Sequence, residues 1–168
     1  MRPSADRTRE TLFSMLVSRL GTLEGLAVLD LFAGSGALAL EALSRGAGAA
    51  LLVEHDRSAR AVAARNIARL GAAGRAEILP WDATRLPRAP RAFDLVLADP
   101  PYGRGLAPAA LASALAQGWI APAAWIAVET GRPDPVDVPG LQCETVRDVG
   151  RARLHLLRPA ASPDGSAR

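Results

Sequence analysis

The 168-residue sequence is poor in several residue types, and each shortage narrows the class of protein. Cys143 is the only cysteine, which excludes an internal disulfide framework and fits a reducing compartment. No apolar run reaches transmembrane length, and the N-terminal segment is charged rather than signal-like. His55 and His155 are the only histidines, and their isolation predicts no metal site. We therefore expect a soluble, cytoplasmic protein with no metal and no membrane partner.

Lysine is absent, so arginine carries all of the basic side-chain charge. The formal net charge is a modest +3, and no bulk negative charge opposes the binding of a polyanion. A chain of this length predicts one domain, which we expect over residues 1–158 with a helix at its start. We expect the domain to be monomeric and to be followed by a disordered tail over residues 159–168.

Short apolar segments alternate with helical patterns along most of the chain. The predicted strands lie at 26–32, 49–54, 76–79, 93–99 and 125–129, and two final strands at 142–149 and 153–157 form a hairpin. The predicted helices lie at 6–20, 37–45, 59–70 and about 108–117. This alternation predicts an α/β fold with a doubly wound, mostly parallel, Rossmann-like sheet of seven strands that ends in an antiparallel hairpin.

Acidic residues stand at the ends of four predicted strands, where such sheets bind their ligands. They are Asp30, Glu54, Asp82 and Asp99. The segment Gly34–Ala39 matches G-x-G-x-x-A, which by itself is typical of a dinucleotide site. Asp30 argues against a dinucleotide, because a carboxylate beside the glycine turn would repel a pyrophosphate.

S-adenosylmethionine fits these acids better, since it carries an ammonium and a sulfonium. Glu54 could accept the ribose hydroxyls, and Asp82 could accept the adenine amino group, although Asp82 could also be only a helix cap. The predicted cofactor-binding set is Asp30, Ala33, Gly34, Ser35, Gly36, Glu54, Asp82 and Ala83.

The stretch LADPPYGRG, at residues 97–105, ends a strand with a rigid acid and an aromatic ring. The Asp99 carboxylate and the Pro100 carbonyl could accept the two hydrogens of an exocyclic amine, which would direct its lone pair at a methyl group. Tyr102 could stack on the base, which must first leave its own stack. We therefore predict Asp99, Pro100 and Tyr102 as catalytic residues.

Together the motifs RPSADRTRETLF, DLFAGSG, ALEALSR, VEHD, WDA and DPPY resemble the bacterial small-subunit rRNA guanine-N2 methyltransferases. The resemblance implies a class I methyltransferase fold and S-adenosylmethionine-dependent methylation of a guanine N2 amine in rRNA, with S-adenosylhomocysteine as product. It implies a partly assembled small ribosomal subunit as the substrate. Arg7, Arg9 and Arg104 are our candidates for phosphate contacts.

Two positions depart from the pattern of that family. Its members usually carry a basic β-hairpin ahead of the R-P stretch, and this sequence starts at that stretch, so we expect a truncated start or a missing docking element. Ala39 stands where the family commonly has glycine, and we expect no effect on the cofactor from this change.

Other functions stay open from the residues alone. D-P-P-Y also fits an N6-adenine methylase of DNA or RNA and a protein-glutamine methylase. The glycine turn fits a nicotinamide-dependent oxidoreductase, and the missing hairpin leaves room for a non-catalytic RNA-binding assembly factor. Cys143 is not in a nucleophile motif and is interpreted as structural. The three tryptophans, Trp81, Trp119 and Trp125, are predicted to pack rather than to stack on bases.

Overall fold

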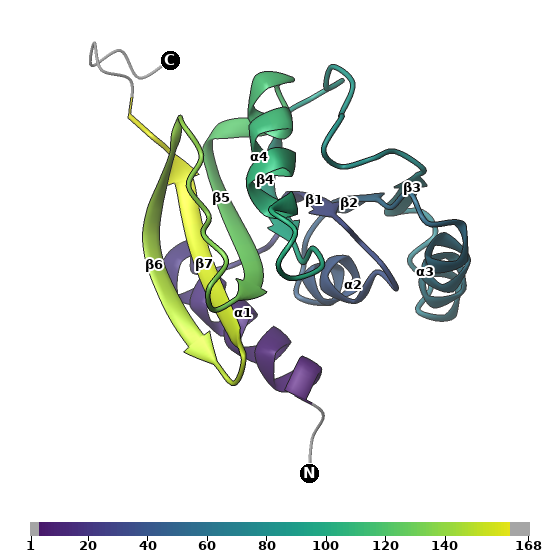
Figure 1. The fold of residues 1–168 in the computed structure, drawn as a ribbon. Helices are drawn as coiled ribbons and strands as arrows, with labels where there is room; N and C mark the ends of the chain where they lie inside the picture. The colour runs from purple at the N-terminus through teal and green to yellow at the C-terminus, as the bar shows by residue number, and fades with distance from the viewer. Residues whose placement is uncertain (1–3, 162–168) are drawn as a thin grey trace.

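The computed structural model describes residues 4–161, which form four helices and seven strands (Figure 1). The helices are α1 (Ser4–Leu20), α2 (Ala37–Ser44), α3 (Arg57–Arg69) and α4 (Leu106–Ala116). The strands are β1 (Ala27–Leu31), β2 (Ala49–Val53), β3 (Ala76–Leu79), β4 (Phe93–Ala98), β5 (Ile120–Gly131), β6 (Leu141–Val149) and β7 (Ala152–Pro159). Arg2 and Pro3 of the N-terminal motif, and positions 162–168 of the predicted tail, lie outside the described residues.

All seven strands join one sheet in the order β3-β2-β1-β4-β5-β7-β6. The pairs from β3 to β5 are parallel, and β7 is antiparallel to both β5 and β6. The predicted α/β class and the predicted C-terminal hairpin are therefore confirmed. The strand order reverses between β1 and β4, so the carboxyl ends of these two strands mark the switch point where open α/β sheets bind ligands.

Apolar layers cover both faces of the sheet, which explains why its central strands read as continuous apolar runs. The helices α1, α2 and α3 cover one face and α4 covers the other (Figure 1). Trp119 is fully buried in the α4 layer, where its ring stacks on Phe93 (centroids 5.7 Å apart). Its indole N–H donates to the Pro87 carbonyl at 2.7 Å, so the predicted packing role is confirmed for this tryptophan.

The main difference from the predicted elements is the start of β5. The prediction began this strand at Trp125, whereas pairing with β4 begins at Ile120 and then shifts register before Trp125. The segment between them is Ala-Pro-Ala-Ala, which has no β-branched side chain and carries a proline. Pattern alone therefore indicated only the second half of the strand. Among residues 4–161, no helix is long and apolar enough to cross a membrane.

Candidate active site

Four carboxylates follow one another along the carboxyl edge of the sheet, one from each of four neighbouring strands. In spatial order they are Glu54 after β2, Asp30 in β1, Asp99 after β4 and Glu129 in β5. Two positions earlier in each strand lies a residue of the apolar layer under α1, α2 and α3, namely Leu52, Val28, Leu97 and Ala127. Because side chains alternate along a strand, all four acids project from that same face. We call these four residues the acid row.

Asp30 is the most enclosed member of the acid row, with 1% of its surface exposed. Its Oδ2 accepts a hydrogen bond from the Ala39 N–H at 3.0 Å, whereas Oδ1 is buried with no partner among the residues described. Burial, and then the negative charges of Asp99 and Glu54, raise the pKa of Asp30 to about 8. A buried carboxyl oxygen without a donor destabilises the fold, so Asp30 suits a donor or cation that arrives with a ligand.

The turn between β1 and α2 brings backbone close to Asp30. Phe32 has a φ of 57°, and it is the one non-glycine residue with positive φ in the described part of the chain. Strain of this kind clusters at functional sites. Gly36 has a φ of 84°, and a Cβ there would lie 3.1 Å from Leu52. The second glycine of the predicted G-x-G pattern is therefore required by the backbone and by close packing.

Glu54 fastens this turn to the end of β2. Its Oε1 accepts the Gly34 N–H at 2.8 Å, and its Oε2 accepts the Asp56 N–H at 2.9 Å. The neighbouring Ala33 N–H donates to the Val53 carbonyl at 3.1 Å. Each carboxylate oxygen has a second lone pair, and the Glu54 side chain is 11% exposed, so it can still accept a ligand hydroxyl.

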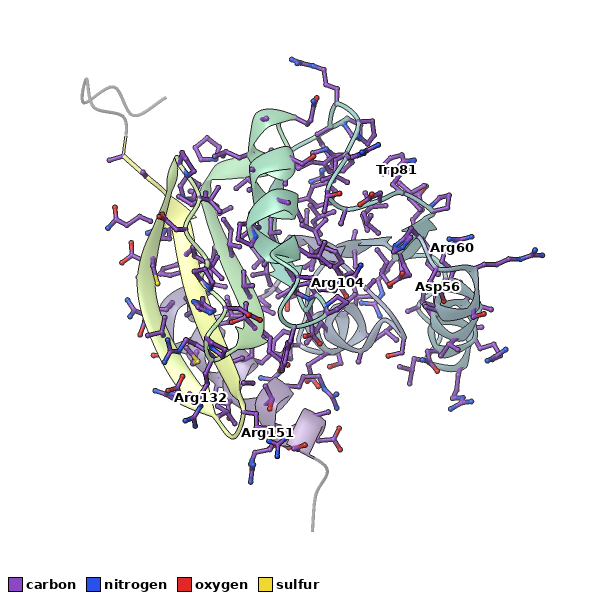
Figure 2. All side chains as sticks on the ribbon, viewed as in Figure 1. Asp56, Arg60, Trp81, Arg104, Arg132 and Arg151 are labelled. Carbon is purple, nitrogen blue, oxygen red and sulfur yellow. The ribbon has the colours of Figure 1, made fainter. Side chains whose placement is uncertain are left out.

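Helix α3 also holds the turn, through a side-chain hydrogen bond. The Asn66 side-chain amide donates to the Ser35 carbonyl at 2.9 Å, across 31 residues of sequence. Asp56 caps α3 by accepting the Ala59 N–H at 2.8 Å, and Figure 2 shows it beside Arg60 at the start of that helix. The glycine turn is thereby fixed to two elements before any ligand binds.

Asp82 and Ala83 lie in the loop after β3, at the same edge of the sheet. Asp82 is exposed, and its Oδ1 accepts both the N–H and the hydroxyl of Thr84 (2.8 and 2.7 Å). These hydrogen bonds lower the pKa of Asp82. Ala83 is buried. The turn-forming role of Asp82 is therefore present, and its Oδ2 carries no hydrogen bond to the described residues.

The D-P-P-Y loop is attached to the end of β5 at two points. The Tyr102 hydroxyl donates to Glu129 Oε2 at 2.6 Å, and the Gly103 N–H donates to Asp134 Oδ2 at 2.7 Å. A Cβ at Gly131 would approach the Tyr102 ring to 3.3 Å, so this glycine lets the ring lie against the strand. Tyr102 remains 46% exposed, which leaves ring surface for a ligand.

Asp99 and Glu129 form a like-charge pair at the centre of this loop. Ala98 pairs with Val128, so the next residues lie side by side, Asp99 directly after β4 and Glu129 within β5. Asp99 is open to solvent on its outer side but crowded by protein within. This burial, and then the charge and hydrogen bonding of Glu129, raise the pKa of Asp99 to about 7. Asp99 can therefore take up a proton near neutral pH.

The three predicted phosphate-binding arginines lie in different surroundings. Arg9 is half-buried between Asp6 (3.0 Å) and Glu41 (3.5 Å), so its charge is largely used in joining α1 to α2. Arg7 is exposed against the β6–β7 turn, with Nη2 3.7 Å from a Cβ built at Gly150. Arg104 is exposed in the loop before α4, as Figure 2 shows. Arg7 and Arg104 therefore remain the better phosphate candidates.

Sequence reasoning did not select three residues of this site: Glu129, Asn66 and Phe32. Glu129 ends a predicted strand, as Asp99 does, and that position was the available signal. Asn66 and Phe32 gave no comparable signal, because a long-range hydrogen bond and a positive φ depend on the folded chain. Within residues 4–161, no group of three or more His, Cys, Asp or Glu side chains is arranged to hold a metal.

Comparisons with known proteins show which family and which fold this chain resembles. The family model described as "Conserved hypothetical protein 95" matches residues 1–158. The chain is 40% identical over 131 residues to ribosomal RNA small subunit methyltransferase D of Escherichia coli strain K12, a match that covers 77% of this chain and 64% of that protein. This chain thus aligns with less than two thirds of that relative.

Solved structures confirm the class I methyltransferase fold. The Escherichia coli protein yhhF superposes with a TM-score of 0.81 at 33% identity, covering 96% of this chain and 89% of that one. A magnesium protoporphyrin IX methyltransferase from Synechocystis with bound SAM gives a TM-score of 0.71 at 15% identity, covering 94% and 80% of the two chains. At that identity the likeness establishes the fold alone.

Proposed function

Because this chain belongs to the family described as conserved hypothetical protein 95, we propose that it transfers a methyl group from S-adenosylmethionine to the N2 amine of a guanine in small-subunit rRNA. One observation carries the proposal: the acid row, with its buried unpartnered oxygen on Asp30, adjoins the D-P-P-Y loop at one edge of the sheet. Charge for a cationic cofactor and acceptors for an amine thus occupy adjoining positions.

The residues at β1 and β2 fit S-adenosylmethionine, which supplies an electrophilic methyl group when bound. Asp30 would hold the ammonium through its unpartnered Oδ1, and Glu54 would accept the ribose hydroxyls. The backbone of Ala33, Gly34, Ser35 and Gly36 would line the cofactor, since this turn is fixed beside Asp30. Asp82 Oδ2 would accept the adenine amine, and Ala83 would pack on the adenine ring. A dinucleotide fits poorly, because its pyrophosphate would meet Asp30.

Asp99 and Pro100 would prepare the acceptor amine. The Asp99 carboxylate and the Pro100 carbonyl would each accept one amine hydrogen, which directs the nitrogen lone pair at the methyl group. Asp99 would also take the proton that the amine loses on methylation and pass it to solvent. Tyr102 would stack on the base, and its hydrogen bond to Glu129 fixes the ring in advance.

The RNA would approach over the exposed arginines near this loop. Arg104 follows the D-P-P-Y motif directly, and Arg7 extends the basic surface along α1. Arg9 would contribute less, because it is held by Asp6 and Glu41. We propose a partly assembled small subunit as the substrate, since the sequence motifs resemble those of the small-subunit rRNA guanine-N2 methyltransferases. We also propose a monomeric enzyme, since one chain supplies every member of the acid row.

The test is transfer of labelled methyl from S-adenosylmethionine to unmodified small ribosomal subunits, free rRNA and DNA in parallel, followed by nucleoside analysis. We expect label on N2-methylguanosine from the subunits. Asp99→Asn serves as the matched control, because it keeps the shape of the side chain but removes the carboxylate charge. Absence of label on every nucleic acid, with cofactor binding intact, would contradict the proposal.

A further inference from the structure

We propose that Glu129 reads the target base: together with Asp99 it accepts the N1–H and N2–H donors of guanine and rejects bases whose N1 is an acceptor. This inference rests on the proposed function and adds the residue that selects guanine. The observation behind it is that a second carboxylate, that of Glu129, lies beside Asp99. Methyl transfer itself does not need this second carboxylate.

The position of Glu129 fixes its relation to Asp99. Parallel pairing of β4 with β5 places Ala98 opposite Val128, so the carboxylates of the next residues lie side by side on neighbouring strands. Leu97 and Ala127 lie in the same apolar layer, and the two acids therefore project from the same face of the sheet. Burial, and then the charge of Glu129, raise the pKa of Asp99, so the two carboxyl groups interact.

No cation offsets this pair in the described part of the chain. The arginine ion pairs with Asp6, Glu41 and Asp148 do not reach Asp99 or Glu129, and His55 lies beside Glu54 instead. The Tyr102 hydroxyl donates to Glu129 Oε2 at 2.6 Å. A glutamine could accept that hydrogen bond without the repulsion, so a purely structural tie does not require a second charge.

Two neighbouring acceptors match the edge of guanine and mismatch the edge of adenine. Guanine presents N1–H beside its N2 amine, so one carboxylate can accept from each group. Adenine presents its N6 amine beside the lone pair of N1. That lone pair would face a carboxylate, and neither of these two acceptors would then have a hydrogen donor. A site built to accept a donor rejects an analogue that lacks it by a large factor, up to about 10⁴.

Tyr102 limits where the base can lie. Its hydroxyl is held by Glu129, and its ring lies against Gly131, where an added Cβ would be 3.3 Å away. A base stacked on the exposed part of this ring has its polar edge directed at the strand ends that carry Asp99 and Glu129. Glu129 thus positions the stacking ring and also faces the edge of the base.

The test compares guanine with 2,6-diaminopurine at the methylated position, after that position has been mapped by nucleoside analysis. Diaminopurine keeps the 2-amine but carries a lone pair at N1. Ligated rRNA with either base would be assayed for kcat/KM with the wild type and Glu129→Gln. We expect the wild type to prefer guanine by about 100-fold or more, and Glu129→Gln to reduce that preference below about 10-fold, since its amide can donate to N1.

Asp134→Asn is the matched control, because Asp134 is a nearby acid, just after β5, that accepts the Gly103 N–H rather than facing the base, and asparagine can still accept that hydrogen bond. It should keep the guanine preference of the wild type. Thermal melting and cofactor affinity of each variant would confirm that the fold is retained. An unchanged preference in Glu129→Gln would overturn the role of this residue.

Two outcomes separate this inference from the proposed function. Label on N2-methylguanosine from the wild type, with an unchanged guanine preference in Glu129→Gln, would overturn base reading by Glu129 while leaving the proposed function intact. A wild type that binds the cofactor but labels no nucleoside would overturn the proposed function, and the base-reading role would fall with it.

Discussion

Replacing Asp30 with asparagine should make the ligand-free protein more stable while weakening its cofactor site. The folded-state pKa of Asp30 is about 8, against 3.8 for an ordinary aspartate. The folded protein therefore holds a proton that the unfolded chain releases, and stability falls as the pH rises between these two values. Each pH unit between 3.8 and 7 costs the folded wild type about 1.36 kcal/mol, which amounts to about 4 kcal/mol at pH 7.

Asparagine removes that cost but adds a smaller one. Its carbonyl can still accept the Ala39 N–H, while its amide would take the position of the unpartnered Oδ1. An unsatisfied buried amide costs about 1–3 kcal/mol, so we expect a net gain of about 1–3 kcal/mol at pH 7. The gain should shrink toward pH 4, where both the folded and unfolded states of the wild type carry the proton.

Urea denaturation at pH 4, 5.5 and 7, with and without S-adenosylmethionine, measures both effects. The cofactor should stabilise the wild type more than Asp30→Asn, because only the wild type offers a carboxylate to the ammonium. Asp94→Asn is a matched control, since Asp94 accepts the Ala27 N–H from the opposite end of β1. A stability difference that does not change with pH, or equal cofactor affinity in wild type and Asp30→Asn, would refute the reasoning.

Four more predictions concern the base-binding loop and the core. Asp99→Asn should lower kcat by at least about 100-fold and leave cofactor affinity within several-fold, as single-turnover kinetics and calorimetry would show. The kcat/KM of the wild type should rise with pH through about 7 and then level, because only ionised Asp99 accepts the amine hydrogen; Glu129→Gln should move this midpoint to lower pH. Tyr102→Ala should raise the KM for RNA by about 5–150-fold, whereas Tyr102→Phe should raise it only a few-fold. Trp119→Ala should cost about 3–5 kcal/mol in denaturant unfolding with no change in cofactor affinity, and a smaller loss would contradict its place in the core.

Much of the fold was predictable because its signals are local. Buried parallel strands need apolar runs on both faces, and β1 shows this with every residue buried. The hairpin of β6 and β7 likewise followed from two strand patterns separated by a short turn. The start of β5 was not predictable from pattern, because Ala-Pro-Ala-Ala joins β4 only through a shifted register.

The candidate site was predictable where it depends on strand ends and hidden where it depends on strand order. Asp30, Glu54 and Asp99 could be placed at one edge, since parallel strands end together. The placement of Glu129 next to Asp99 could not be predicted, because it requires β5 to lie directly beside β4. The contact of Arg9 with Glu41 was also hidden in the sequence, because the two residues lie on different helices that meet only in the folded chain.

The distribution of charge explains why the acid row is better understood as a binding surface than as a structural cluster. The chain has 20 arginines, and the arginine ion pairs with Asp6, Glu41 and Asp148 do not reach the acid row, where His55 lies 3.7 Å from Glu54. Burial, and then repulsion between neighbouring acids, raise the pKa of Asp30 and of Asp99, and none of these arginine pairs offsets this. A cationic cofactor beside Asp30 and a base edge rich in hydrogen donors beside Asp99 would each relieve it. The same electrostatic strain that lowers stability without ligands thus favours the binding of both.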